Sequence, residues 1–548
     1  MLTLTVRDMV KVTGAEDPKV EKLIDETCSY KPASFYFIKL RYKNYDGVHF
    51  YRSSIFPLGL LERVQDVLKG AGVEFSVVDE RGPPQGTTIP EKGALGLRPY
   101  QERAVTAFAQ KGYVGIINAC TGSGKTIMAI DIIKRLKTPV VIYVPTTVLL
   151  YQWKNEIENF IDMECGTIGD GKCEIRPVTV AMYQTVSRAL TDNVFSKYVT
   201  DAWSMEKDTT DIVNRQEAII SFIRSAGLSV MDECHTCGAK TFLQVAINTP
   251  ARYKLGLSAT SLMRPDGADL AVIAGCGEPC AHVTTSELIK GGYLSPLIVK
   301  IVTLPDLKAR KKQKTGKKLA GMDKEAGELE TDEKDDGLSA AEKADRKREA
   351  GRQDYGRIKT EHVHSEGRNA KVIEQTEALL GEGRTVLVLV AEIAHGKTLK
   401  GILESRLGRP VIFLSGTASG KKRMKVVDAL KDGSEKLVIT TSIFEYGLDV
   451  PRLSGLVIAS PSKSMIKTIQ RVGRILRKHP DKKDAKIVDF DDINADYFRE
   501  HFIERMRFYV SEPEFTLEYD GVDPKVVKLI SRPKDVKEFL FEWERGIR

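Results

Sequence analysis

Ala119-Cys-Thr-Gly-Ser-Gly-Lys125-Thr126 is the most informative stretch of this sequence. A short apolar run, Val114 to Ile117, precedes it, and a helix-like segment, Ile127 to Leu136, follows it. A strand, a loop of small residues, Lys-Thr and a helix together form the layout of a phosphate-binding loop. The alternative is a glycine-rich turn, which does not by itself explain Lys-Thr at the start of a helix. We therefore expect a nucleotide site here.

The loop is expected to hold the phosphates of the nucleotide. Backbone N–H groups point into such a loop, and the helix N-terminus adds partial positive charge. Lys125 would reach the β- and γ-phosphates, and the Thr126 hydroxyl would bind Mg²⁺. Ala119 stands where the usual pattern has its first glycine. The residues expected to surround the phosphates are Ala119, Cys120, Thr121, Gly122, Ser123, Gly124, Lys125 and Thr126.

A second acidic motif fits the other half of an ATPase site. The apolar run Leu228 to Met231 leads directly into Asp232-Glu233-Cys234-His235. Asp232 would hold Mg²⁺ through water, and Glu233 would orient and deprotonate the attacking water. An acidic loop after a strand is the alternative interpretation. The position of the pair, about a hundred residues after a phosphate loop, favours the ATPase interpretation.

Length and composition exclude several classes of protein. At 548 residues the chain is too long for one core, and about three domains are expected. Its 42% apolar and 29% charged residues fit a soluble globular protein, and its charge of +8 permits nucleic-acid binding without requiring it. The sequence has no long apolar run for a membrane span and no signal peptide at its start. We therefore expect no membrane partner and a cytoplasmic location, in a cell or in a virus's host.

The cysteines need a separate interpretation. Eight cysteines in a chain of this length do not form a disulfide framework. Two close pairs, Cys234 with Cys237 and Cys276 with Cys280, would be enough to bind zinc through four thiolates. Because Cys234 lies inside the acidic motif and neither pair has the glycines of a zinc knuckle, we do not expect a zinc site.

Strand and helix patterns alternate along most of the chain after residue 94. This alternation predicts an α/β fold with parallel sheets covered by helices on both faces. The expected domains are residues 94–298 and 354–500, and the tail 501–548 is expected to pack on the second of them. In the intervening segment 306–350, 25 of 45 residues are charged, so we expect a flexible insertion.

Residues 1–93 are expected to form a small α+β accessory domain. Leu2 to Val6 alternates like a strand, and Phe56 to Lys69 has the pattern of an amphipathic helix. Ser34 to Tyr42 and Val48 to Ser53 are expected to form a hairpin. Aromatic residues interleaved with lysines and arginines can stack bases and follow phosphates. An ordinary core with a solvated face explains the same composition equally well.

The second α/β segment carries two further motifs. One runs from Thr441 to Asp449, and the other is Gln470-Arg-Val-Gly-Arg474-Ile-Leu-Arg477. Arg474 and Arg477 are three residues apart and share one face of a helix. Such a pair can stabilise the charge on a γ-phosphate that another domain holds. An ordinary basic helix face would not explain the flanking Gln470 and Gly473.

In their order and spacing, these stretches resemble the motor of superfamily 2 helicases, with coverage from about residue 95 to 492. Within that superfamily the sequence is most similar to the branched-DNA helicases of tailed bacteriophages and to XPB-type translocases. The residues that carry this narrower resemblance are Asp232-Glu-Cys-His235, Met263-Arg-Pro-Asp-Gly267, Leu288-Ile-Lys-Gly-Gly-Tyr-Leu294, His395-Gly396 and Gln470 through His479.

The resemblance implies a site shared by two RecA-like domains. Lys125, Thr126, Asp232 and Glu233 would act from the first domain with ATP and Mg²⁺. The second domain would add the catalytic residues Gln470, Arg474 and Arg477, and Gly447 and Asp449 as further ATP contacts. Arg98 and Gln101 would lie beside adenine. The residues expected to couple hydrolysis to movement are His235, Ser258, Ala259 and Thr260, with His235 contacting Gln470, and those expected to grip the nucleic-acid backbone are Pro145, Thr146, Gln184 and Thr441.

The resulting expectation is a monomeric, ATP-dependent DNA helicase or translocase acting on forks, displacement loops or Holliday junctions in recombination, replication or repair. The N-terminal domain would help to recognise the branched DNA. An RNA helicase or transcript-release factor is the first alternative, because backbone contacts do not distinguish DNA from RNA. A non-enzymatic ATP-gated clamp is the second, and Glu233 with both arginines argues against it.

Overall fold

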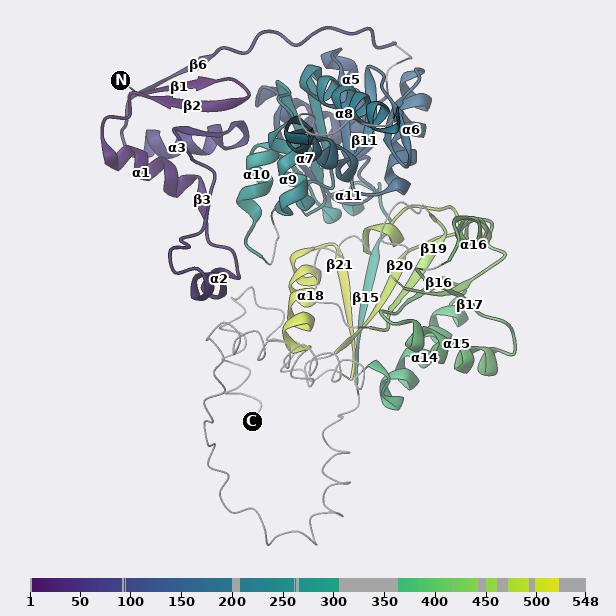
Figure 1. Ribbon diagram of the computed structural model, residues 1–548. Helices are drawn as coiled ribbons and strands as arrows, with labels where there is room; N and C mark the ends of the chain where they lie inside the picture. The colour runs from purple at the N-terminus through teal and green to yellow at the C-terminus, as the bar shows by residue number, and fades with distance from the viewer. Residues whose placement is uncertain are drawn as a thin grey trace, which may run out of the picture. The chain divides into compact units, whose positions relative to one another are not determined.

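A computed structural model gives the structure of the chain (Figure 1). It describes residues 2–90, 93, 95–199, 207–260, 262, 266–304, 363–416, 418–441, 450–460, 472–491 and 498–521. The chain divides into two compact units, Met1–Thr284 and Thr285–Arg548. Within the described residues, no helix is both long enough and apolar enough to cross a membrane.

The first unit begins with a small α+β domain (Figure 1). Its sheet has the order β5-β2-β1-β6, in which β1 pairs antiparallel with β2 and parallel with β6. Alternate residues of β1 are buried, as a half-buried strand requires. The elements are β1 (Leu2–Val6), β2 (Met9–Thr13), α1 (Pro18–Thr27), β3 (Ser29–Tyr30), α2 (Phe35–Arg41), β4 (Val48–His49), β5 (Ile55–Pro57), the 3₁₀ turn η1 (Leu58–Leu60), α3 (Leu61–Gly70) and β6 (Phe75–Asp79).

Two local predictions for this domain were wrong. The first arm of the expected hairpin is the helix α2, and β4 pairs with β3 instead. The backbone N–H of Ile38 donates to the carbonyl oxygen of Ser34, as in the first turn of a helix. Burial of the Phe35 side chain anchors this helix to the domain. The expected helix from residue 56 begins only at Leu61, because Pro57 belongs to the short strand β5. Proline has no backbone N–H to donate, and its position in this strand does not require one.

The rest of the first unit is an α/β domain, which confirms the predicted fold class. Its sheet has the order β10-β9-β11-β8-β12-β13-β7-β14, and β10 is the antiparallel strand at one edge. The central strands β8 and β12 are buried along their whole length, as expected for a sheet covered on both faces. The strands are β7 (Val114–Ala119), β8 (Val140–Val144), β9 (Gly166–Gly169), β10 (Lys172–Glu174), β11 (Val178–Met182), β12 (Leu228–Asp232), β13 (Tyr253–Ser258) and β14 (Pro279–Val283). The helices are α4 (Pro99–Gln110), α5 (Lys125–Leu136), α6 (Thr147–Ile161), α7 (Tyr183–Val199), α8 (Lys207–Ser225), the 3₁₀ turn η2 (Cys234–Gly238), α9 (Lys240–Ile247) and α10 (Asp269–Cys276).

The N-terminal domain and this α/β domain share one core. Leu270, Ile273 and Ala274 of α10 belong to the same apolar cluster as the N-terminal strands and helices. At the contact, a Cβ on Gly59 would lie 2.1 Å from the carbonyl oxygen of Ile273, so only glycine fits there. Arg63 Nε also donates to Glu278 Oε1 at 2.7 Å. The N-terminal domain is therefore an integral part of the first unit.

The second unit contains a parallel sheet of order β17-β18-β16-β19-β20-β15-β21. β15 (Leu297–Thr303) lies between β20 (Ala485–Asp491) and β21 (Phe515–Asp520). The boundary expected at residue 298 therefore falls inside a strand of this sheet. The other strands are β16 (Thr385–Leu389), β17 (Ile412–Leu414), β18 (Leu437–Thr440) and β19 (Leu453–Ile458), and the helices are α11 (Thr285–Lys290), α14 (Glu366–Gly381), α15 (Ile393–Leu407), α16 (Gly420–Asp432) and α18 (Arg499–Ser511).

Part of the C-terminal tail belongs to this second sheet. Helix α18 packs beside the sheet through a buried ion pair, in which Arg505 Nε donates to Asp489 Oδ2 at 2.8 Å. Tyr509 donates to the same carboxylate oxygen at 3.0 Å. β21 then adds a strand next to β15. The charged segment 306–350 and the tail beyond residue 521 lie outside the described residues.

Candidate ATPase site

The predicted strand, loop and helix are present at residues 114–136. β7 ends at Ala119, and α5 begins at Lys125. Gly122 and Gly124 have φ values of 87° and 79°, which glycine adopts without strain. Lys125 Nζ donates to the carbonyl oxygen of Ala119 at 3.0 Å. The lysine therefore lies folded over the loop in which it is predicted to meet phosphate.

Two residues of α4 hold the loop in place. Tyr100 Oη and Gln101 Nε2 both donate to the carbonyl oxygen of Ser123, at 2.9 and 2.8 Å. Gln101 Oε1 accepts from the backbone N–H of Arg98 at 2.9 Å. Both amide atoms of the buried Gln101 are therefore bonded to the protein. Whether Gln101 also reads adenine stays a prediction, while its contact with the loop is a feature of this structure.

Asp232 is a buried carboxylate at the end of β12. Its Oδ2 accepts from Trp153 Nε1 at 2.8 Å, and its Oδ1 accepts from the backbone N–H of Glu233 at 3.0 Å. Burial, followed by the charge of Glu233, raises the pKa of Asp232 to about 6, and Trp153 and Lys125 oppose this shift. Glu233 has a φ of 51°, an uncommon conformation for a residue with a side chain. Such strain is frequent at functional sites.

The residues at this edge of the sheet fit a magnesium ion. Mg²⁺ prefers hard oxygen donors, and a Thr126 hydroxyl with an Asp232 carboxylate would provide them. Strand β13 pairs with both β7 and β12, so the phosphate loop and the acidic motif follow strands of one sheet at the same edge. A bound cation would also favour the ionised form of this buried carboxylate. Thr126 and Asp232 are therefore the residues that would hold the metal.

A hydrogen-bonded network joins the acidic motif to the end of β13. His235 Nδ1 lies 3.3 Å from Glu233 Oε2 and 3.1 Å from Ser258 Oγ. Ser258 Oγ also accepts from the backbone N–H of Thr260 at 3.1 Å. The predicted coupling residues are thus brought together, except that Gln470, the expected partner of His235, lies outside the described residues.

Asn118 belongs to the same network and was missed in the sequence. With its amide oriented to donate, Asn118 Nδ2 lies 3.1 Å from the carbonyl oxygen of Ser258 and 3.0 Å from that of Ala259. Asn118 lies in β7, directly before the phosphate loop, so it ties the loop strand to the coupling segment. In the sequence, the feature that could have pointed to Asn118 is a polar side chain inside an otherwise apolar strand.

The residues predicted to grip nucleic acid follow the carboxyl ends of strands, two of them neighbours in the first unit and one in the second. Gln184 Nε2 donates to the carbonyl oxygen of Pro145 at 3.1 Å, which joins the segments that follow β8 and β11. Thr146 Oγ1 accepts from the backbone N–H of Leu149 at 3.4 Å and caps α6. In the second unit, Thr441 follows β18 and is buried. Their contact with a nucleic-acid strand stays a prediction.

The arginine segment of the second unit is held by a lysine that the sequence analysis missed. Lys482 Nζ donates to the carbonyl oxygens of Leu453 and Arg477, each at 2.8 Å, and also to that of Ile475. Arg474 and Arg477 therefore belong to a backbone segment fixed from within the second unit. Burial lowers the pKa of Lys482 to about 7, and the nearby charge of Arg384 adds to this effect. The other predicted members of this half-site, Gly447 and Asp449, lie outside the described residues.

Replacing Lys482 with Met should impair hydrolysis more than ATP binding. The apolar side chain leaves the carbonyls of Leu453, Ile475 and Arg477 without their shared donor, at a cost of about 1–3 kcal/mol for a buried group. We expect kcat to fall about tenfold, while the phosphate loop of the first unit still binds ATP. Steady-state ATPase rates and ATP titrations would measure the two effects. Equal kcat in both proteins would contradict the assigned role.

The same substitution should change the pH dependence of stability. Unfolded lysine keeps its proton up to a pH of about 10.5, whereas folded Lys482 releases it near 7. The unfolded state therefore binds more protons across this window, and stability rises with pH by up to about 1.4 kcal/mol per pH unit. The wild type should gain stability over Lys482→Met between pH 7 and 9. If the melting temperatures of the wild type and of Lys482→Met change with pH in parallel, this expectation is contradicted.

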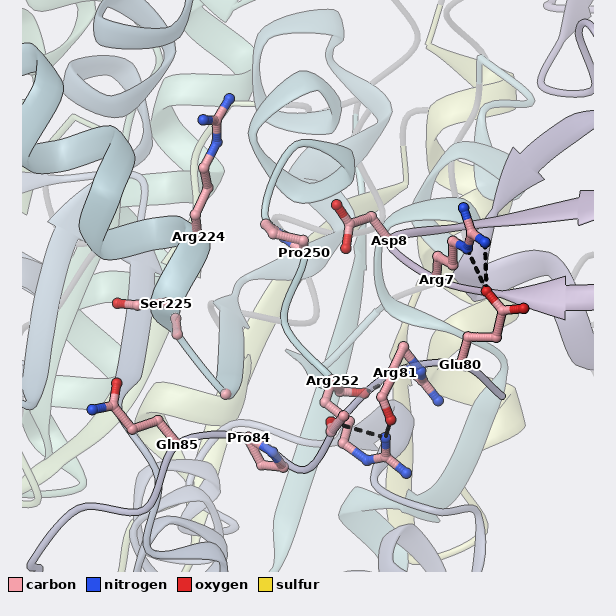
Figure 2. Close-up of a pocket in the computed structure, with 13 residues that line it drawn as sticks. Arg7, Asp8, Glu80, Arg81, Pro84, Gln85, Arg224, Ser225, Pro250 and Arg252 are labelled. Carbon is pink, nitrogen blue, oxygen red and sulfur yellow. Dashed lines mark hydrogen bonds and ion pairs between the residues drawn. The ribbon is translucent and has the colours of Figure 1, made fainter. Parts of the chain in front are cut away.

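A pocket of about 500 Å³ lies elsewhere in the first unit (Figure 2). It is lined by residues of the N-terminal domain, of the linker near residue 82 and of the segments that precede β12 and β13. Arg7 pairs with Glu80 at 2.6 Å, and Arg252 Nη1 donates to the carbonyl oxygen of Arg81 at 2.8 Å. Because it lies at the amino ends of the strands, this pocket is separate from the phosphate loop.

Comparison with known protein families agrees with the site. The family described as type III restriction enzyme, res subunit, matches residues 94–262, and the family described as helicase conserved C-terminal domain matches residues 370–479. These two matches identify the chain as a helicase. It is therefore an enzyme of the ATP-dependent helicase class, and the loop and acidic motif belong to the first of its two matched domains.

This helicase is similar to several known proteins. It is 25% identical over 404 residues to the DNA 3'-5' translocase XPB2 of Sulfurisphaera tokodaii, covering 73% of this chain and 82% of the relative. It is 22% identical over 428 residues to the ATP-dependent DNA helicase uvsW of Enterobacteria phage T4, covering 72% of each chain. The solved structure of T4 UvsW is 19% identical, with a TM-score of 0.38, covering 94% of this chain and 99% of that one.

Proposed function

We propose that this helicase is an ATP-driven motor that moves on DNA and remodels branched DNA, such as forks, displacement loops or Holliday junctions. The observation that carries the proposal is the connected half-site of the first unit. There, Lys125 lies over the phosphate loop, and the Asp232-Glu233 pair is joined through His235 to Ser258. This arrangement supports hydrolysis that is coupled to movement.

Hydrolysis would use residues of both units. Glu233 would orient the attacking water and accept its proton, while Lys125 would stabilise the charge on the transferred phosphoryl group. Mg²⁺, held by Thr126 and Asp232, would neutralise charge on the phosphate oxygens. Arg474 and Arg477 would complete the site from the second unit. Because the arginines are attracted by the charge of the γ-phosphate, bound ATP would favour closure, and release of the cleaved phosphate would remove that charge and favour opening.

Movement would follow from the contacts around Glu233. His235 lies between Glu233 and Ser258, so a change at the γ-phosphate would reach the end of β13 through two short contacts. The segments after β8 and β11 lie at the same edge of the sheet and are joined by Gln184 and Pro145. We infer that these segments hold the strand's backbone while the second unit advances.

DNA is the proposed substrate because two relatives are named for activity on DNA, as a DNA translocase and a DNA helicase. The motifs themselves do not favour DNA over RNA, since contacts with phosphate and sugar carry little sequence information. Branched substrates are proposed from the narrower resemblance in sequence. An RNA helicase is the alternative outcome of the test.

A gel assay on labelled substrates would test the proposal. Forks, Holliday junctions and plain duplexes of matched sequence should be incubated with and without ATP. We expect ATP-dependent conversion of forks and junctions to new strand pairings, with little change in the plain duplex. Equal conversion of all three substrates would contradict the preference for branches, and no conversion of any DNA would contradict the motor assignment.

A further inference from the structure

An exposed aromatic and basic surface surrounds α2 in the N-terminal domain. We call the side chains of Lys31, Tyr36, Lys39, Leu40, Arg41, Tyr42 and Lys43 the α2 surface. Helix α2 lies at the end of the N-terminal domain, away from strands β1 and β2 (Figure 1). The nucleotide site uses none of these residues, and the family motifs do not include them.

The apolar members of this surface are unusually exposed. Tyr36 is 77% exposed, Leu40 67% and Tyr42 61%, the three highest values among large apolar side chains in the described part of the chain. Tyr36 and Leu40 are four residues apart and lie on one face of α2. The neighbouring Phe35 is buried, so the helix has an anchored side and an open side. Clustered exposed apolar side chains mark binding surfaces.

The positive charge of residues 31–45 indicates which kind of partner the α2 surface would bind. Between residues 31 and 45 the sequence has four basic residues and no acidic residue, within a chain whose total charge is +8. Lys31 and Lys39 lie 5.1 and 5.5 Å from the ring of Phe35, and the Arg41 guanidinium lies 5.8 Å from the ring of Tyr42. Lys39, Arg41 and Lys43 are exposed. A polyanion that also offers flat apolar faces fits this surface best.

The segment that leads into α2 is hydrogen-bonded to a residue that lies close in sequence to the predicted coupling residues. The backbone N–H of Ala33, two residues before α2, donates to the carbonyl oxygen of Asp266 at 3.0 Å. Asp266 follows Ser258-Ala-Thr260 by only a few residues along the chain. A ligand held on the α2 surface would therefore be bound beside a segment that is close in sequence to the residues predicted to couple hydrolysis to movement.

We propose that the α2 surface binds unpaired bases of a nucleic-acid strand beside a branch point. Tyr36 and Tyr42 would stack on bases, and Lys39, Arg41 and Lys43 would contact the phosphates. Unpaired bases are favoured over duplex because a base pair inside a helix has no free face for an aromatic ring. This inference rests on the proposed function and adds a second, motor-independent contact to it.

Deleting the N-terminal domain would be a poor test, because Leu270, Ile273 and Ala274 of α10 share its core. Substitutions on the exposed surface avoid this problem. The first comparison is Tyr36→Ala with Tyr42→Ala against Tyr36→Phe with Tyr42→Phe in the full chain. Anisotropy would measure affinity for a fork with single-stranded arms and for a blunt duplex. The alanine protein should bind the fork at least about 30-fold more weakly, since stacking is worth about 1–3 kcal/mol for each base and two rings are removed, while the phenylalanine protein keeps wild-type affinity.

A second comparison tests the charges. Lys39→Gln with Lys43→Gln removes two charges from the α2 surface. Lys22→Gln with Lys69→Gln removes two exposed charges from α1 and α3 of the same domain and is the matched control. For single strands, each lost phosphate contact should lower the slope of log affinity against log salt by about 0.7. We expect a decrease of about 1.4 for the first pair and no change for the control.

The outcomes separate this inference from the proposed function. If the alanine protein keeps both the wild-type melting temperature and the wild-type affinity for the fork, the inference is overturned. A surface that binds another protein instead of nucleic acid would give this result. Equal losses on fork and blunt duplex would also overturn the preference for unpaired bases. A wild type that neither binds DNA nor hydrolyses ATP faster with DNA would instead overturn the proposed function. ATPase without DNA should be unchanged in all four variants.

Discussion

Replacing Glu233 with Gln is expected to lower kcat of ATP hydrolysis by about a thousandfold, because glutamine cannot accept a proton from the attacking water. ATP binding should persist, since the phosphate loop and its contacts with Tyr100 and Gln101 are unchanged. Glutamine also keeps an oxygen that can remain near His235, which lies 3.3 Å from the carboxylate. Steady-state ATPase rates and equilibrium titration with a fluorescent ATP analogue would separate turnover from binding.

Glu164→Gln is a suitable control for this change. Its carboxylate is exposed on the same domain and pairs with Arg176 at 3.2 Å. Exposed ion pairs contribute little, about 0–1 kcal/mol, so this variant should hydrolyse ATP at the wild-type rate. Wild-type hydrolysis in Glu233→Gln would remove Glu233 from the mechanism, and loss of ATP binding would show that the residue acts on the loop instead.

Replacing Lys125 with Ala is expected to weaken ATP binding and to abolish measurable turnover. A hydrogen bond to a charged group is worth about 1.5–3 kcal/mol, which corresponds to a loss of about 10- to 150-fold in affinity. The substitution removes a charge that would stabilise both bound ATP and the transition state, so binding and chemistry should fall together. This pattern differs from that of Glu233→Gln, in which only turnover falls.

The control for Lys125 lies on the same helix. Lys134 Nζ donates to the carbonyl oxygen of Gly93 at 3.0 Å and belongs to no part of the proposed site. Lys134→Ala should therefore bind and hydrolyse ATP like the wild type. If Lys125→Ala kept the wild-type affinity for ATP, residues 119–126 would not be the phosphate-binding loop, even though they have the expected shape.

The local geometry that the structure shares with the prediction, namely the strand, loop and helix and the strand that ends in the acidic pair, depends on local chemistry. A phosphate loop needs small residues with unusual backbone angles, and Gly122 and Gly124 adopt them. An acidic pair after an apolar strand lies at the carboxyl edge of a parallel sheet, where β12 places Asp232. Both patterns lie within a few consecutive residues, so sequence alone identifies them.

The parts that the sequence analysis missed depend on contacts between distant residues. Trp153 donates to Asp232 across 79 positions, and Lys482 holds the carbonyl oxygen of Leu453 across 29. No short pattern predicts such partners. The first domain was expected to end at residue 298, yet this position lies inside β15, which pairs with β20 and β21. Neighbours in a sheet are set by packing and need not be neighbours in sequence.

The helix α2 illustrates a different difficulty. Its residues, Phe35 to Arg41, are rich in aromatic side chains, which favour strands in general. The aromatic residues were expected to be either core or nucleic-acid contacts, and the structure shows that some are buried and others exposed. Phe35 and Phe56 are buried, whereas Tyr36 and Tyr42 are exposed. Composition cannot make this division, because it depends on which face of the helix meets the domain.

The most direct test of the proposed motor is the ATPase rate of the wild-type protein with different nucleic acids. Forked DNA, single-stranded DNA and RNA of matched sequence should be compared at equal nucleotide concentration. We predict that DNA stimulates hydrolysis, most strongly when it is forked, and that RNA stimulates it little. Stimulation by RNA alone would contradict the account.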